Sequence, residues 1–139
     1  MKLKDSSLFR QQCHVNGAWV DAAGGVTIPV TNPATGAKLG TVPSIDAKGT
    51  EAAVAAAHAA FPAWAAKTAK ERAVMLRRWF ELIMANADDL AMLMTAEQGK
   101  PLAESRGEIA YAASFVEWFG EEAKRLYGDV IPGHQADKR

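Results

Sequence analysis

The chain has 139 residues, 49% of them hydrophobic and 23% charged, which is typical of a soluble globular protein with room for one core. Sixteen basic residues balance sixteen acidic ones, so the net charge favours neither nucleic acid nor an anionic membrane surface as a partner. The single cysteine, Cys13, excludes an internal disulfide, and no apolar run approaches the roughly 20 residues needed to cross a bilayer. Because the first residues also lack the apolar core of a signal peptide, we expect a cytoplasmic protein.

Residues 12–42 are predicted to be β-rich. The dipeptide Asn16-Gly17 stands between apolar positions and predicts a hairpin over residues 13–20, because both residues tolerate a positive φ. A second hairpin is expected between residues 26–30 and 38–42, around a turn that contains proline and glycine. Pro29 cannot donate a backbone hydrogen bond, so its strand should lie at a sheet edge.

Residues 46–127 are predicted to form four helices. Asp46 is the expected N-cap of the first helix. The second helix has the spacing of a capping box, with Thr68 and Glu71 each able to bond the other's backbone N–H, and it should end near Asn86.

The stretch TAEQGKPLAES separates the third helix from the fourth. Its Gly-Lys pair suggests a phosphate-binding loop, but the required earlier glycine is Met94 and the required hydroxyl residue is Pro101. Gly99 is instead expected to end the third helix in the left-handed conformation. Pro101 should then start a fourth helix that runs to about Tyr127 and is close to 40 Å long.

The fourth helix is apolar nearly all round in its middle. A helix of this kind must be buried on several sides, and the other predicted elements are too few to cover it. We therefore infer that partner structure is missing. Its two apolar faces collect Leu102, Ile109, Ala112, Val116, Phe119, Ala123 and Leu126 on one side, and Tyr111, Phe115 and Trp118 on the other.

Few residues suggest chemistry by themselves. The adjacent pairs Asp88-Asp89 and Glu121-Glu122 point about 100° apart on a helix and are interpreted as solvated faces or helix-start charges. Glu108 shares one side of the long helix with Tyr111 and Phe115. This arrangement suits either the wall of an apolar channel or an ordinary core. No complete catalytic set is present.

Four stretches of the sequence, VNGAWVDA, VTNPATGAKLGTVP, FPAWAAKTAKERAVMLRRWFELI and DDLAMLMTAEQGKPLAESRGEIAYAASFVEWFGEEAKRLYGDVIPG, together resemble the aldehyde dehydrogenase superfamily. Within it, the chain is most similar to bacterial NAD(P)-dependent succinate-semialdehyde dehydrogenases. The resemblance implies an α/β fold, of which this chain would supply a mainly α-helical part with short N-terminal β-hairpins.

The resemblance further implies that residues 1–139 are the N-terminal segment of a longer oxidoreductase, with residues 128–139 as a linker to the remainder. The family's catalytic cysteine, glutamate base and principal NAD(P)-binding residues would follow the end of this sequence. No catalytic or cofactor-binding residue is therefore assigned here, and the chain alone is expected to be inactive and to bind no cofactor. Expected partners are the C-terminal remainder and further copies in a homo-oligomer.

Two candidate sites follow from the resemblance. Glu97, with the main-chain carbonyl of Val30 or Thr31, resembles a structural monovalent-cation site, although Glu97 could instead cap or pair near the helix end. Glu108, Tyr111 and Phe115 resemble the wall of the aldehyde entrance channel. The alternative to an enzyme segment is an independent helical interaction module, because large apolar surfaces often bind other proteins.

Overall fold

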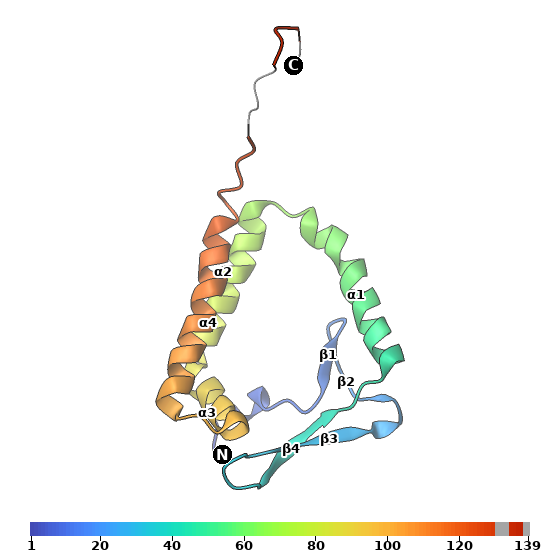
Figure 1. Ribbon diagram of the computed structural model, residues 1–139, viewed down its shortest axis with the longest axis vertical. Helices are drawn as coiled ribbons and strands as arrows, with labels where there is room; N and C mark the ends of the chain where they lie inside the picture. Colours follow the sequence, from blue (N-terminus) through green and yellow to red (C-terminus); the bar gives the residue numbers. More distant parts are fainter. Residues whose placement is uncertain (130–133, 138–139) are drawn as a thin grey trace.

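The computed structural model describes residues 1–129 and 134–137, and its elements form a three-sided frame (Figure 1). Helix α1 makes one side, the α2–α4 pair makes another, and the β3–β4 hairpin lies along the base. The described part is mainly helical, with two short antiparallel strand pairs, as predicted. The elements in chain order are η1 (Ser6–Leu8), β1 (Cys13–Val15), β2 (Ala18–Val20), η2 (Ala23–Gly25), β3 (Thr27–Thr31), β4 (Lys38–Pro43), α1 (Ala47–Ala65), α2 (Ala69–Ala85), α3 (Ala87–Gln98) and α4 (Leu102–Glu122).

Both predicted hairpins are confirmed. β1 pairs with β2 around Asn16 and Gly17, whose φ angles of 50° and 78° are those that the Asn-Gly turn requires. β3 pairs with β4 in a separate two-stranded sheet, with an irregularity in register next to Val30. A two-stranded sheet has only edge strands, so Pro29 lies at an edge as expected.

The predicted helix starts are also confirmed. The Asp46 carboxylate accepts the Gly49 N–H at 2.8 Å. Thr68 and Glu71 form the reciprocal capping box, in which the Glu71 carboxylate accepts the Thr68 N–H at 2.8 Å. These bonds satisfy backbone donors that have no partner within the helix, and they fix where α1 and α2 begin.

The predicted end of the fourth helix at Tyr127 is wrong, because α4 ends at Glu122 and spans about 32 Å at the standard rise. Beyond Ala123 the backbone bonds tighten to three-residue steps, with the Lys124 N–H donating to the Glu121 carbonyl at 3.2 Å. Leu126 and Tyr127 are each 83% exposed, so the described chain does not bury the apolar residues that follow Glu122. The predicted linker over 128–139 lies partly outside the described residues.

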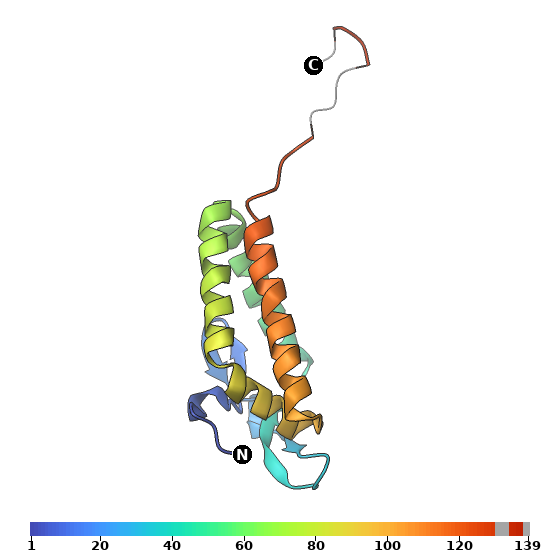
Figure 2. The same ribbon diagram turned by 90° about the vertical axis from the view of Figure 1, so that its left-hand side faces the viewer.

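Helices α2 and α4 lie side by side, and α3 crosses the base of α4 (Figure 2). Close packing depends on small residues: Gly120 is buried, and a Cβ added there would lie 3.3 Å from the Cβ of Leu76. Where α3 meets α4, the Ser105 hydroxyl is fully buried and lies 2.8 Å from the Thr95 hydroxyl. The apolar face predicted for the fourth helix is only partly buried, since Phe119, one of its members, is 59% exposed.

The described chain buries little apolar surface. Within residues 1–129 and 134–137, the buried hydrophobic residues are all alanines: Ala22, Ala73, Ala91 and Ala113. Large apolar side chains are exposed on three helices, including Phe61 on α1 and Trp79 on α2. Exposed apolar area of this extent marks surfaces that other protein structure covers. No helix in the described part is long and apolar enough to cross a membrane.

Candidate cation site and channel wall

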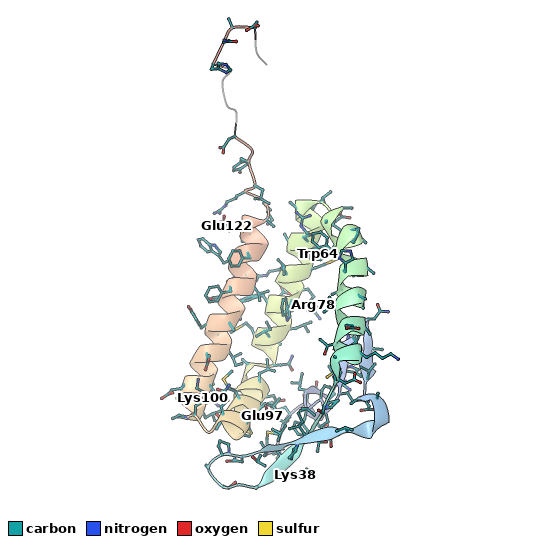
Figure 3. The ribbon with its side chains drawn as sticks, turned by 45° about the vertical axis from the view of Figure 1, so that its right-hand side comes forward. Lys38, Trp64, Arg78, Glu97, Lys100 and Glu122 are labelled. Carbon is teal, nitrogen blue, oxygen red and sulfur yellow. The ribbon has the colours of Figure 1, made fainter. Side chains whose placement is uncertain are left out.

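The joint between α3 and α4 is built by Gly99. This residue has φ 76° and ends α3 in the left-handed conformation, as its position predicted. A Cβ at Gly99 would lie only 2.8 Å from Cγ of Pro33, so the turn of the β3–β4 hairpin rests against this joint. Figure 3 shows the result: Glu97 and Lys100 lie at the base of the helices, above the hairpin.

Glu97 and Val30 line the same small hollow. The other residues around it are Phe9, Arg10, Gln11, Gly40, Thr41 and Val42. Its volume is ≈ 20 Å³, enough for about one water-sized occupant. Thr31, the other predicted carbonyl donor, is not among the lining residues. The structure therefore brings together two members of the predicted cation set and leaves the third outside.

Glu97 gives this hollow one carboxylate, and hard monovalent cations prefer oxygen ligands such as carboxylates and main-chain carbonyls. Arg10 also lines the hollow, but its guanidinium carbon lies over the Trp19 ring at 4.9 Å from the centroid. Across the described residues, no three His, Cys, Asp or Glu side chains gather as they would for a transition metal. Glu97 forms no cap or ion pair with any described residue.

The predicted channel residues lie together on the exposed side of α4. The Glu108 carboxylate pairs with the Lys100 ammonium group. The Tyr111 and Phe115 rings meet edge to face, with centroids 4.8 Å apart and an interplanar angle of 79°. Tyr111 is 65% exposed, so within this chain these residues do not belong to a core. An open hollow of ≈ 730 Å³ continues along α4 from Phe115 past Trp118.

Asp89 is the residue that sequence reasoning missed. The sequence allows a solvated face or a helix-start charge, and the solvated alternative is wrong because Asp89 is only 5% exposed. Both of its carboxylate oxygens accept backbone N–H groups, from Lys4 at 3.0 Å and from Asp5 at 2.8 Å. Its placement in the first turn of α3 agrees with the helix-start interpretation. No local pattern signals this role, because the two donors precede Asp89 by more than eighty residues.

Asp88, its neighbour, behaves as the sequence suggested. Its carboxylate is exposed and bonds to the Lys4 ammonium at 3.2 Å and to Arg106 at 3.1 Å. The bond from Lys4, followed by that from Arg106, holds the pKa of Asp88 below its usual value. Cys13 is a free, half-buried thiol in β1.

Comparison with known proteins gives a consistent result. A profile described as the aldehyde dehydrogenase family matches residues 19–139. Glutarate-semialdehyde dehydrogenase of Pseudomonas putida is 67% identical over all of this chain, which covers 29% of that protein. The succinate-semialdehyde dehydrogenase GabD of Escherichia coli K12, named for NADP(+), is also 67% identical over the whole chain, which again covers 29% of the relative.

Solved structures agree with the sequence comparison. The crystal structure of succinate-semialdehyde dehydrogenase from Burkholderia pseudomallei superposes with a TM-score of 0.95 at 55% identity, over 99% of this chain and 28% of that one. The chain thus spans about 29% of the length of the curated relatives it matches. Both the match along the sequence and the match in three dimensions identify one family: the chain belongs to the aldehyde dehydrogenase family.

Proposed function

We propose that this chain is the N-terminal segment of an NAD(P)-dependent enzyme that oxidises succinate semialdehyde to succinate. The observation that carries this proposal is the 67% identity to the Escherichia coli enzyme over the full chain. A relative of equal identity is named for glutarate semialdehyde. The substrate class proposed here is therefore a short aldehyde with a carboxylate at its other end, with succinate semialdehyde as the first member to test.

Within that enzyme, this segment would support the fold and form part of the path by which the aldehyde enters. The α4 side with Glu108, Tyr111 and Phe115 would wall the aldehyde's entrance, and the Glu97 hollow would hold a monovalent cation. Pairing with Lys100 would reduce the repulsion that Glu108 exerts on an anionic substrate. NAD(P) would accept the hydride in the complete enzyme. We assign no catalytic residue to this chain, since its single thiol, Cys13, is half-buried in strand β1.

The exposed apolar faces support the same proposal. Phe61 on α1, Trp79 on α2 and Trp118 on α4 are each more than half exposed. In a complete enzyme the remainder of the chain would cover these faces, and further copies would complete a homo-oligomer. A cytoplasmic location, inferred from the single free cysteine, belongs to the same proposal.

The test is an assay of aldehyde oxidation with succinate semialdehyde and either NADP or NAD, followed by nicotinamide absorbance. The 139-residue chain is assayed alone and after mixing with the remainder of the Escherichia coli relative, expressed without its own matching segment. We expect no turnover by either part and measurable turnover by the mixture. Turnover by the chain alone would defeat the proposal.

The independent interaction module makes a different prediction. Such a module should be a stable monomer with a cooperative thermal transition in the absence of any other protein. Size-exclusion chromatography and thermal unfolding of the purified chain distinguish the two functions. A monodisperse, cooperatively folded chain that does not bind the remainder would favour the module.

A further inference from the structure

The segment over residues 4–11 links α3 to β4, although it lies at the opposite end of the sequence from α3. Figure 1 draws this segment in dark blue, passing from the base of α3 toward the strands. It contains the single turn η1, in which the Asp5 carboxylate accepts the Ser7 N–H at 2.9 Å. This bond stiffens the middle of the segment, and a fixed contact anchors each end.

The first anchor is Asp89. Its two carboxylate oxygens accept the backbone N–H groups of Lys4 and Asp5, and the carboxylate is almost fully buried. A buried carboxylate that is held by two N–H donors forms charge-assisted bonds, which are about twice as strong as neutral ones. Both donors are backbone N–H groups, so the contact fixes the path of the backbone at residues 4 and 5. It does not require a lysine side chain at position 4.

The second anchor lies on β4. The Gln11 side-chain oxygen accepts the Thr41 N–H at 2.8 Å, which occupies a donor at the outer edge of the sheet. Gly40 permits this contact, because a Cβ there would lie 2.6 Å from the Gln11 oxygen and 2.8 Å from the tip of the Phe9 ring. An alanine at this position would require the tips of the Gln11 and Phe9 side chains to move.

Between the two anchors, the segment forms one wall of the Glu97 hollow. Phe9, Arg10 and Gln11 supply this wall, and Glu97 with strands β3 and β4 supplies the others. We propose that residues 4–11 act as a strap that walls one side of the Glu97 hollow, and that Asp89 is the positioning residue that fastens it. Glu97 itself is exposed, so the hollow is open on the Glu97 side; when Asp89 releases Lys4 and Asp5, the wall loses its upstream anchor and the hollow widens.

The strap has a consequence for the cation. An occupant of the hollow would be held longest when the strap is closed, and by linkage the occupant would keep the strap closed. This second statement rests on the proposed cation site, whereas the strap itself does not. The experiment therefore reads strap opening and the effect of the cation separately.

Strap opening is measured by hydrogen exchange of a complete enzyme in which this chain replaces the matching segment of the Escherichia coli relative, resolved to residues 4–11. Asp89→Asn keeps the size of the side chain but can accept only one of the two N–H groups. Loss of a charge-assisted bond is expected to speed exchange of the Lys4 and Asp5 amides by about tenfold to a hundredfold. The amides of α2 and α4 should keep their exchange rates.

The matched control is Asp88→Asn. It removes the same charge from the adjacent position, where the carboxylate makes only exposed ion pairs, and exchange at residues 4–11 should rise less than about fivefold. Equal effects of the two variants, or no effect of Asp89→Asn, would overturn the strap. If Asp89→Asn unfolds the whole chain, Gln11→Ala loosens the other anchor. It should speed exchange at residues 9–11 and at the Thr41 amide, and unchanged rates there would overturn the proposal equally.

The cation is tested with KCl against tetramethylammonium chloride at the same ionic strength. Potassium is expected to slow strap exchange several-fold in the wild-type chain and to have no effect in Glu97→Gln. If potassium has no effect while Asp89→Asn still opens the strap, the cation site is refuted and the strap stands. If potassium slows exchange equally in Glu97→Gln, the linkage between the Glu97 hollow and the strap is refuted.

Discussion

Gly99 provides the strongest test of the fold at the joint that carries Glu97. Gly99→Ala places a Cβ on a residue with φ 76°, which costs about 1–2 kcal/mol. The same Cβ would lie 2.8 Å from Cγ of Pro33, and overpacking of this kind adds about 1–3 kcal/mol. The expected loss in the free energy of unfolding is therefore about 2–5 kcal/mol in total.

A double-mutant cycle separates the two causes. In a Pro33→Ala background the ring carbon is gone, so Gly99→Ala should cost only the backbone part, about 1–2 kcal/mol. Urea unfolding followed by far-ultraviolet circular dichroism measures all four proteins. If Gly99→Ala costs the same with and without Pro33, the hairpin turn does not rest on the α3–α4 joint, and the reasoning from the structure is refuted.

Gly107 is the matched control for Gly99. It lies close to Gly99 in sequence but inside α4, and an added Cβ would meet nothing within 4 Å. Gly107→Ala should therefore stabilise the chain by about 0.5–1 kcal/mol, because alanine loses less backbone entropy in a helix. The same substitution thus has opposite signs at two nearby positions.

Three further predictions concern the helices. Ser105→Ala should lower the free energy of unfolding by about 1–3 kcal/mol, and adding Thr95→Val should recover part of it because no unpaired hydroxyl remains; urea unfolding of both variants checks this. The lowered pKa of Asp88 gives stability that is fully present above its ordinary value of 3.8 and is lost as pH falls through the lower folded-state pKa. The stability difference between wild type and Asp88→Asn should accordingly vanish in acid, and a difference that grows as the pH falls would contradict the bond from Lys4. Trp118→Ser should change stability by less than about 0.5 kcal/mol while reducing binding of an apolar dye, since this ring is exposed; a loss above about 2 kcal/mol would show that it is buried in solution.

Local signals in the sequence predicted the local structure correctly. The Asn16-Gly17 turn, the Thr68 capping box and the left-handed Gly99 each depend on residues within four positions of one another. Their energetic origin is a backbone donor or a backbone angle that only a few residue types satisfy. Such features are readable without knowledge of the tertiary structure.

Long-range features were not readable in this way. The contact of Asp89 with Lys4 and Asp5 was not predicted because these donors lie at the far end of the sequence. The overlong fourth helix reflects an apolar pattern that continues past Glu122, where the described chain does not bury it. The prediction that Val30 lies near Glu97 came from the family resemblance. Spacing in the sequence could not give it, because the contact depends on how the β3–β4 hairpin packs against α3. The sequence pattern was based on large apolar side chains, so it did not predict that small residues such as Gly120 would be the buried positions of α4.

The central claim is that the exposed apolar faces of this chain are completed by the remainder of an aldehyde dehydrogenase. Hydroxyl-radical labelling of Trp118 measures this directly, because the side chain is 61% exposed in the chain alone. On adding the remainder of the Escherichia coli relative, we expect labelling of Trp118 to fall several-fold, while the exposed ring of His134 serves as an internal reference. Unchanged labelling of Trp118 in the presence of excess remainder would contradict the claim.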